Sequence, residues 1–211
     1  MPLVHEAFAS YLEGLIPARP AVLQEMEAYA RAHRFPIVGP VVGQLFYILT
    51  RISGARRVFE MGSGYGYSTA WFAMGVRDNG GGEVFHVVWD EALSQSARMY
   101  LDRLGLRAHV RFHVGEAIAA LRGAEGRFDI IFNDIDKHGY PDSLPVTKEK
   151  LRSGGILIID NMIWHGQILD LNDHEKNTEA IRQFTGAITT DSDWIVSLTP
   201  TRDGMIVAYK K

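Results

Sequence analysis

The chain has 211 residues, a length that suits one α/β domain and leaves little room for two. Hydrophobic residues make up 46% of it and charged residues 22%, an ordinary globular composition that argues against bulk disorder. The formal net charge of -3 argues against general nucleic-acid binding, and the lack of cysteine excludes disulfides, thiolate metal sites and a cysteine nucleophile.

No targeting or membrane-spanning signal is visible in the sequence. The N-terminal stretch MPLVHEAFASYLEGL contains acids and lacks a basic region ahead of an apolar core, which is unlike a signal peptide. The longest uncharged stretch, from Phe35 to Thr50, is shorter than the ~20 residues that a membrane helix requires and is interrupted by prolines and glycines. Since cysteine is also absent, we expect a cytoplasmic protein with no membrane partner.

Two helices are predicted before any strand. Residues 18–34 carry apolar or small residues at helical spacing and end in basic residues, which suit a helix C-terminus. Residues 40–53 predict a second, more buried helix. We therefore expect a single domain, residues 1–211, made of N-terminal helices (1–54) and an αβ core (55–211).

The core alternates short apolar runs with helical segments. The runs are nearly continuous in Ile, Val, Leu and Phe, which is typical of strands buried on both faces. Such alternation predicts a parallel sheet with right-handed crossovers and helices on both faces. The expected strands are Arg57–Met61, Glu83–Trp89, His109–Val114, Phe128–Asn133 and Gly155–Asp160, and the expected helices are residues 67–77, 91–104, 116–122 and 142–152.

The last two expected strands pair differently. Trp194–Leu198 and Met205–Tyr209 are separated only by residues 199–204, whereas a parallel connection needs about a dozen residues or more. At least this pair is therefore antiparallel. The predicted fold class is α/β, with a mostly parallel seven-stranded sheet, an antiparallel C-terminal hairpin strand and helices on both faces.

A glycine-rich turn, EMGSGYGYS, follows the first expected strand from Glu60 to Ser68. Alternating glycines let a ligand approach the backbone closely, and the next helix offers N-terminal N–H groups to a negative group. The dinucleotide fingerprint fails because Tyr67 stands where its last glycine is needed, and a P-loop lysine is missing. The pattern E-x-G-x-G-x-G resembles the first motif of class I S-adenosylmethionine-dependent methyltransferases, and a tight turn without a ligand is the alternative.

Oxygen-bearing side chains and one lysine follow two later strand ends. FDIIFND places Asp134 at a strand end with Lys137 close behind, and GGILIIDN places Asp160 and Asn161 at the next one. If these strands are neighbours about 4.8 Å apart, the side chains converge beside the glycine-rich turn. Oxygen ligands without His or Cys select a hard cation such as Mg²⁺, Mn²⁺ or Ca²⁺. Taken singly, each residue is also typical of a turn, a helix cap or an exposed surface.

These segments together resemble the cation-dependent O-methyltransferases that include caffeoyl-CoA and catechol O-methyltransferases. The resemblance spans roughly residues 20–210 and rests on VFEMGSGYGYS, FDIIFNDIDKHGY, GGILIIDNMIWHG and the final DGMIVA. It implies a Rossmann-like class I methyltransferase fold, with S-adenosylmethionine and a divalent cation (Mg, Mn or Ca) as cofactors. It also implies a homodimer, with the N-terminal helices as the candidate interface.

The resemblance further implies roles for single residues. Asp134, Asp160 and Asn161 would be the metal ligands, and Lys137 would be the general base. Ser68 would help to hold the methionine end of the cofactor, with adenine contacts from the turn after the third strand. The full set expected at the cofactor is Val38, Glu60, Gly62, Ser63, Ser68, Val88, Glu116, Ala117 and Asp134, and the residues expected near the acceptor are Tyr140 and Trp164.

The chemistry implied by this resemblance is consistent with the residue types. Coordination by a cation lowers the pKa of a hydroxyl group, so that its oxyanion forms near neutral pH. Repulsion by the same cation favours the uncharged form of Lys137, which can then accept the proton. The oxygen attacks the sulfonium methyl group in line, and the protein mainly supplies positioning and electrostatics.

The match departs from the family where the ribose is expected. The family usually has an acid near the end of the second strand, but VFHVVWD places Val88 there, with Asp90 two residues on and about 6.6 Å further along. Asp90 reaching the ribose, a bridging water and a decayed site are the alternatives, and retained binding is favoured because the metal and base positions are intact. His138 and His165 flank the site and are interpreted as loop residues.

Three functions follow as hypotheses. The first is metal-dependent methylation of one hydroxyl of a small catechol-like or phenolic acceptor, because two adjacent oxygens can chelate a cation. The second keeps the chemistry and takes a hydroxylated tRNA base as acceptor. The third is a non-catalytic scaffold with a weakened cofactor site, suggested by Val88 alone. Acceptor specificity is expected to depend on residues 1–20, 138–145 and 162–175.

Overall fold

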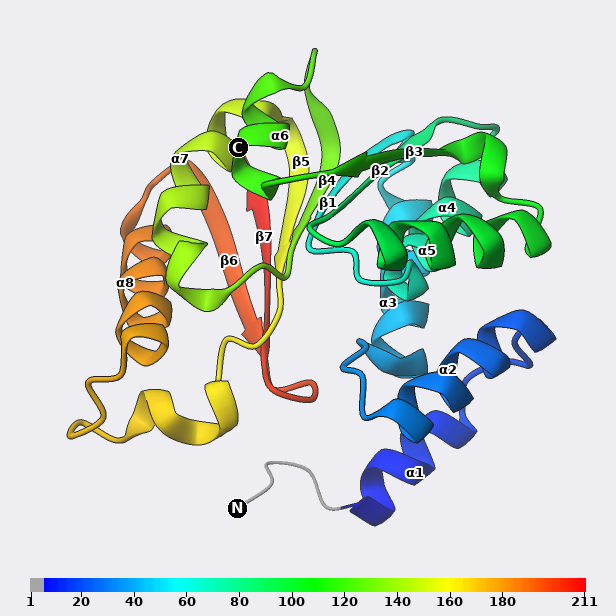
Figure 1. Cartoon of the computed structure of the whole chain (residues 1–211). Helices are drawn as coiled ribbons and strands as arrows, with labels where there is room; N and C mark the ends of the chain where they lie inside the picture. Colours follow the sequence, from blue (N-terminus) through cyan, green and yellow to red (C-terminus); the bar gives the residue numbers. More distant parts are fainter. Residues whose placement is uncertain (1–5) are drawn as a thin grey trace.

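The computed structural model describes residues 6–211 as a central seven-stranded sheet with helices around it (Figure 1). The strand order is β3-β2-β1-β4-β5-β7-β6, so the direction of winding reverses between β1 and β4. The strands are β1 (Arg57–Met61), β2 (Glu83–Val88), β3 (Val110–Val114), β4 (Phe128–Asn133), β5 (Leu151–Ile159), β6 (Trp194–Thr199) and β7 (Met205–Lys210).

The sheet is mostly parallel, as predicted. Strands β1 to β5 pair in parallel, and β7 runs antiparallel to both of its neighbours, β5 and β6. The register pairs Met61 with Asn133 and Asn133 with Ile159, so the carboxyl ends of β1, β4 and β5 stand side by side. Ligands of open α/β sheets bind beyond such strand ends, at the point where the strand order reverses.

Helices cover both faces of this sheet. On one face α3 packs against α4 and α2 against α5, and on the other α6, α7 and α8 pack in sequence (Figure 1). Within residues 6–211, no helix is both long and apolar enough to cross a membrane. The helices are α1 (Glu6–Gly14), α2 (Ala21–His33), α3 (Gly39–Ile52), α4 (Tyr67–Asp78), α5 (Glu91–Arg103), α6 (Ala117–Gly123), α7 (Tyr140–Lys150) and α8 (Lys176–Thr190), with short 3₁₀ turns η1 (Arg107–His109), η2 (Lys137–Gly139) and η3 (Trp164–Leu169).

Two helices were missed by the sequence prediction. Helix α1 lies inside residues 1–20, which were treated as a loop that shapes specificity; the first five of them lie outside the described residues. Helix α8 was not predicted because its segment contains several threonines and a glycine, which are weak helix formers, although its buried residues Ile181, Phe184 and Ile188 recur at helical spacing. Strand β5 also begins four residues earlier than the predicted Gly155, directly after α7.

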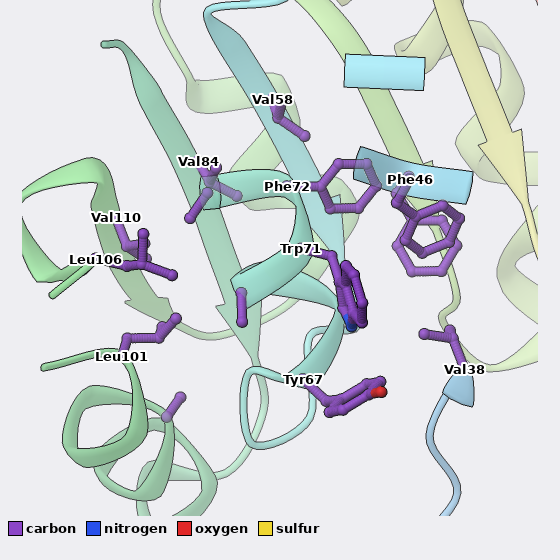
Figure 2. Close-up of a cluster of buried hydrophobic side chains, with 14 of the residues drawn as sticks. Val38, Phe46, Val58, Tyr67, Trp71, Phe72, Val84, Leu101, Leu106 and Val110 are labelled. Carbon is purple, nitrogen blue, oxygen red and sulfur yellow. The ribbon is translucent and has the colours of Figure 1, made fainter. Parts of the chain in front are cut away.

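Two apolar clusters hold the helices to the sheet. The cluster on the α2–α5 face contains Phe46, whose ring stacks on that of Phe72 with centroids 4.6 Å apart (Figure 2). The cluster on the other face joins α8 to the sheet through Phe184, which packs edge-on against Tyr140 at 5.7 Å. Adjacent residues of β4, such as Ile130 and Ile131, belong to opposite clusters, so this central strand is buried on both faces. A rigid core therefore fixes the strand ends that carry the predicted site.

Candidate functional site

The glycine-rich turn after β1 lies directly against the end of β4. The Asp134 N–H donates to the Met61 carbonyl at 2.9 Å, and Gly62 takes a φ of +88° beside it. A Cβ on Gly62 would lie 2.3 Å from the Asp134 carbonyl oxygen, so glycine is required here. Ser63 ties the turn to β2, because its N–H donates to Val87 O and its Oγ accepts from Val87 N, both at 2.9 Å. The turn is thus held by both neighbouring strands.

Glu60 is a fully buried acid at the base of this turn. Its Oε2 accepts a hydrogen bond from Thr69, whose hydroxyl also lies 3.0 Å from His86 Nδ1. Desolvation raises the pKa of Glu60 to about 7, although the hydroxyls of Ser68, Thr69 and Ser63 oppose the rise. Its other oxygen, Oε1, has no hydrogen-bond partner among the described residues. An acceptor is therefore left available at the foot of the glycine-rich turn.

The other predicted cofactor residues lie around the same edge of the sheet. Val38 precedes α3, and Ser68 sits buried in the first turn of α4. Glu116 precedes α6, and its carboxylate accepts from Ile118 N at 2.7 Å and Ala119 N at 2.5 Å, while Ala117 is the first residue of that helix. Each of these positions is a loop–helix boundary, where N–H groups are left for caps or ligands.

The end of β2 is apolar, as the sequence predicted. Val88 is buried as the last residue of the strand, and its carbonyl accepts from Gly115 N at 3.0 Å. Asp90 caps α5 through a 2.9 Å hydrogen bond from Leu93 N to its Oδ1. At least one oxygen of Asp90 is therefore engaged in holding its own helix, which weakens the alternative that Asp90 replaces the missing ribose acid.

The two predicted carboxylate ligands meet at the adjacent ends of β4 and β5. Asp160 N donates to Asn133 O at 3.2 Å, so the backbone holds the two strand ends in register. Desolvation raises the pKa of Asp134, and desolvation together with the nearby Asp134 charge raises the pKa of Asp160. The charge of Arg202 opposes both rises. The charge of Asp134 therefore disfavours ionisation of Asp160, and the two carboxylates form an acidic spot that Lys137 and Arg202 partly neutralise.

Lys137 is held inside this acidic spot. Its Nζ donates to Asp134 Oδ1 at 2.8 Å and to Ile135 O at 3.1 Å, and it lies 5.2 Å from the centre of the Tyr140 ring. Its side chain is 11% exposed, so the amine has a fixed position with limited access to water. The structure thus places Lys137 in direct contact with one of the two acids.

Asn161 and Trp164 lie on the loop that leaves β5. Both residues have positive φ angles, 57° and 49°, as does His165 at 55°. Asn161 N donates to Asp160 Oδ1 at 2.8 Å, and Asn161 Nδ2 lies 3.5 Å from Asp203 Oδ2. Trp164 is partly buried and stacks on His165 at 5.6 Å. The loop therefore brings an amide and an aromatic ring to the strand ends.

Tyr140 takes a different position from the one expected at an acceptor. It is fully buried, and its hydroxyl donates to the Asp160 carbonyl at 2.9 Å. Burial and the surrounding acids raise its pKa well above the usual value, so the hydroxyl stays a donor. Tyr140 thus supports the end of β5, and in this structure no part of its side chain faces an open surface.

Two residues of the β6–β7 turn were missed as site residues. Arg202 donates to the Ile37 carbonyl, and Asp203 contacts Asn161 and His165. The only sequence signal for them was the final DGMIVA segment, of which Asp203 is the first residue. Hairpin spacing gives no indication that a turn between two C-terminal strands reaches the ends of β4 and β5.

The described residues bring together two carboxylates and one amide, and they hold no group of three or more His, Cys, Asp or Glu side chains placed to bind a metal. The candidate set is therefore built from Asp134, Asp160 and Asn161, whose oxygens suit a hard cation. These oxygens, the glycine-rich turn and Lys137 share one edge of the sheet. Such an arrangement can bind a nucleoside-like ligand beside a cation and move a proton.

Comparison with known proteins points to one protein family. A family model described as O-methyltransferase matches residues 19–211. The catechol O-methyltransferase of Niastella koreensis is 32% identical over 184 residues, which covers 82% of this chain and 82% of that protein. The probable caffeoyl-CoA O-methyltransferase 2 of Dictyostelium discoideum is 28% identical over 171 residues, which covers 78% of this chain and 73% of that protein.

Solved structures with a similar fold are also O-methyltransferases. The O-methyltransferase from Bacillus cereus, determined in complex with SAH, has a TM-score of 0.88 and 27% identity and covers 97% of each chain. The O-methyltransferase TomG from Streptomyces achromogenes, determined in complex with SAM, has a TM-score of 0.86 and 25% identity, covering 96% of this chain and 95% of that one.

Proposed function

Because the chain belongs to the O-methyltransferase family and is an S-adenosylmethionine-dependent enzyme, we propose that it methylates a hydroxyl of a small catechol-like or phenolic acceptor with the help of a divalent cation. The family resemblance inferred from the sequence is confirmed by the comparisons. The observation that carries the finer proposal is the meeting of Asp134, Asp160 and Lys137 at two adjacent strand ends.

The side chains at these strand ends fit a hard divalent cation. Asp134 and Asp160 disfavour each other's charge, so a cation shared between them would stabilise both ionised forms. Asn161 would add an amide oxygen as the third ligand. When bound, the cation would lower the pKa of a coordinated hydroxyl group and orient it. Mg²⁺, Mn²⁺ and Ca²⁺ all accept such oxygen ligands.

Lys137 would act as the general base. Its Nζ is fixed by Asp134 and the Ile135 carbonyl, so it stands at a defined point beside the two acids. A proton released by the acceptor hydroxyl would pass to this nitrogen, provided that the amine is uncharged. General-base catalysis of this kind contributes about 10²- to 10⁴-fold to a rate.

The glycine-rich turn and its neighbours would hold S-adenosylmethionine, which supplies the methyl group when bound. The unpartnered Oε1 of Glu60 would accept from the amine end of the cofactor, directly or through water. Val38, Gly62, Ser63 and Ser68 would surround the same end. Val88, Glu116 and Ala117 would face the adenosine, with Val88 giving apolar contact where an acid is usual.

Trp164 would contribute an aromatic wall to the acceptor site, since it lies on the loop that carries Asn161. An aromatic acceptor could pack on such a ring, while two adjacent oxygens of a catechol would satisfy a cation better than one. Support for this acceptor class comes from the similarity to the Niastella koreensis protein. Tyr140 would hold the backbone of Asp160 in place through its hydrogen bond to the Asp160 carbonyl.

Transfer of labelled methyl groups from S-adenosylmethionine to catechol, caffeic acid and phenol tests this proposal. We expect turnover with the catechols that EDTA abolishes and added Mg²⁺ restores, and little turnover with phenol. Equal rates with and without EDTA would contradict the role of the cation. The same assay with total tRNA as acceptor tests the second hypothesis from the sequence, which no contact among residues 6–211 specifically supports.

The comparisons favour an enzyme over the non-catalytic scaffold, because the matched proteins are named methyltransferases. The homodimer and the cytoplasmic location stay predictions from the sequence.

A further inference from the structure

We propose that Asp203, on the turn between β6 and β7, is a positioning residue that sets which end of the Asn161 side-chain amide faces Asp134 and Asp160. The inference rests on the proposed cation-dependent function and adds to it a residue outside the candidate ligand set. Asp203 comes from the far end of the chain and stands behind the loop that leaves β5. In Figure 1 this turn and η3 lie beyond the same end of the sheet.

The loop from Asn161 to His165 is conformationally strained. Three of its non-glycine residues, Asn161, Trp164 and His165, have φ angles between 49° and 57°. Each such residue costs on the order of 1 kcal/mol or more, so the conformation persists only where surrounding contacts impose it. The loop therefore needs a partner that fixes its backbone.

Residues 203 and 204 supply those contacts. Met162 N donates to Gly204 O at 2.9 Å, and Ile163 N donates to Asp203 O at 2.8 Å. A Cβ on Gly204 would lie 2.3 Å from Ile163 Cγ1, so the two segments approach as closely as a glycine allows. The loop is thus attached to the β6–β7 turn along its length.

The Asp203 side chain makes the contacts that choose an orientation. Its Oδ1 accepts from His165 N at 2.5 Å, and its Oδ2 lies 3.5 Å from Asn161 Nδ2. A carboxylate only accepts hydrogen bonds, so it attracts the NH₂ end of the Asn161 amide and leaves the amide oxygen on the other side. Without this acceptor, nothing among the described side-chain contacts distinguishes the two ends of that amide.

The charge around Asp203 is consistent with a fixed acceptor. Its side chain is 14% exposed and lies 3.5 Å from His165 Nδ1, while Arg202 precedes it in the turn. Residues that orient a metal ligand from behind typically change metal affinity by about 10- to 100-fold when they are replaced. Asp203 has the position and the hydrogen-bonding type for such a role.

A four-member cycle of full-length proteins tests the inference: wild type, Asp203→Asn, Asn161→Asp, and the double variant with both changes. Asp203→Asn keeps an oxygen for His165 N but presents an NH₂ group to Asn161, so the amide should turn its oxygen away from the two acids. Asn161→Asp alone places two carboxylates face to face. The double variant restores a donor–acceptor pair with reversed polarity and keeps an oxygen for the cation.

The readout is the affinity for Mn²⁺ alone, measured by calorimetry and by the loss of the free Mn²⁺ signal in electron paramagnetic resonance. We expect Asp203→Asn to weaken binding by about 10- to 100-fold and the double variant to recover most of the loss. Asp193→Asn, a change of an exposed acid paired with Lys148, should leave the affinity unchanged. Asp203→Ser, whose hydroxyl is too short to span to the amide, should repeat the loss if the asparagine variant fails to fold.

The possible results distinguish the role of Asp203 from the proposed cation dependence. Wild-type binding with an unchanged affinity in Asp203→Asn, or independent effects of the two changes in the double variant, would overturn the role of Asp203 alone. Failure of the wild type to bind Mn²⁺ in an Asp160-dependent manner would overturn the cation-dependent function and this inference together.

Discussion

The guanidinium of Arg202 donates a hydrogen bond to the carbonyl of Ile37, and so joins the β6–β7 turn to the residue before Val38. The two residues are 165 positions apart in the chain. This contact therefore connects the segment between α2 and α3 to the turn that lies beside the ends of β4 and β5. The same guanidinium opposes, through its charge, the pKa rises that desolvation causes at Asp134 and Asp160.

We predict that Arg202→Ala weakens S-adenosylmethionine binding roughly two- to tenfold, the equivalent of about 0.5–1.5 kcal/mol for one hydrogen bond. The physical reason is that the backbone at Val38 loses its tie to the sheet. Calorimetric titration with the cofactor measures the change, and Arg122→Ala, at an exposed arginine at the end of α6, is the matched control. An unchanged affinity in Arg202→Ala would show that the tie is not needed.

Lys137→Met should lower kcat for methyl transfer by about 10²- to 10⁴-fold, the contribution expected of a general base. Cofactor affinity should change less than kcat, because Asp134 is the one residue expected at the cofactor that the Lys137 amine contacts, and the glycine-rich turn is not among its partners. Steady-state kinetics and calorimetry on the same preparation separate the two effects. Lys176→Met, at the exposed start of α8, is the control, and a Lys137 variant with wild-type kcat would remove this residue from the mechanism.

Glu60→Gln should change how stability depends on pH. The folded-state pKa of Glu60 is raised from 4.5 to about 7, so between these values the folded state holds a proton that the unfolded state has released. The contribution of protonated Glu60 to the free energy of unfolding is therefore fully present below about pH 4.5 and is lost as the pH rises to about 7. The variant should lack this loss and be more stable than wild type at pH 8, by on the order of 1–3 kcal/mol.

Urea unfolding at pH 5 and at pH 8 measures this effect. The Glu60→Gln variant and wild type should be close in stability at pH 5 and should separate at pH 8. A stability difference that is the same at both values would mean that Glu60 does not titrate in this range. Glu125→Gln, at an exposed acid beyond α6, is the control for a general charge effect.

Val88→Asp should tighten S-adenosylmethionine binding by about tenfold or more, since a hydrogen bond to a charged group contributes about 1.5–3 kcal/mol. The same change places a carboxylate at a position that is 7% exposed, so the melting temperature without cofactor should fall. Calorimetry and thermal unfolding with and without cofactor test both effects, with Val88→Asn as the neutral control. Unchanged or weaker binding in Val88→Asp would show that the ribose does not lie at the end of β2.

The sequence was sufficient for the parallel core because strands buried on both faces leave continuous apolar runs, as in FDIIF and GILII. The same reasoning placed Asp134 and Asp160 correctly, since parallel strand ends that follow each other in the chain became neighbours in the sheet. The role expected of Lys137 came from the family resemblance, and the structure pairs this lysine with Asp134, three residues earlier.

Other parts of the site could not be predicted in this way. Arg202 and Asp203 reach the strand ends through a hairpin whose position depends on β7 pairing with β5, and this pairing is not encoded by local spacing. Tyr140 is buried against Phe184 in α8, a helix whose sequence contains several threonines and a glycine and was therefore not predicted. Packing between segments far apart in the chain thus determines both the position of this turn and the burial of Tyr140.

Cation-dependent catalysis is tested most directly by methyl transfer to catechol by wild type and by Asp160→Ala, each assayed in EDTA and after addition of Mg²⁺. We expect that EDTA abolishes wild-type turnover, that Mg²⁺ restores it, and that Asp160→Ala stays inactive in both conditions while still binding S-adenosylmethionine. Turnover by wild type in EDTA at an undiminished rate, or full activity of Asp160→Ala, would contradict this cation dependence.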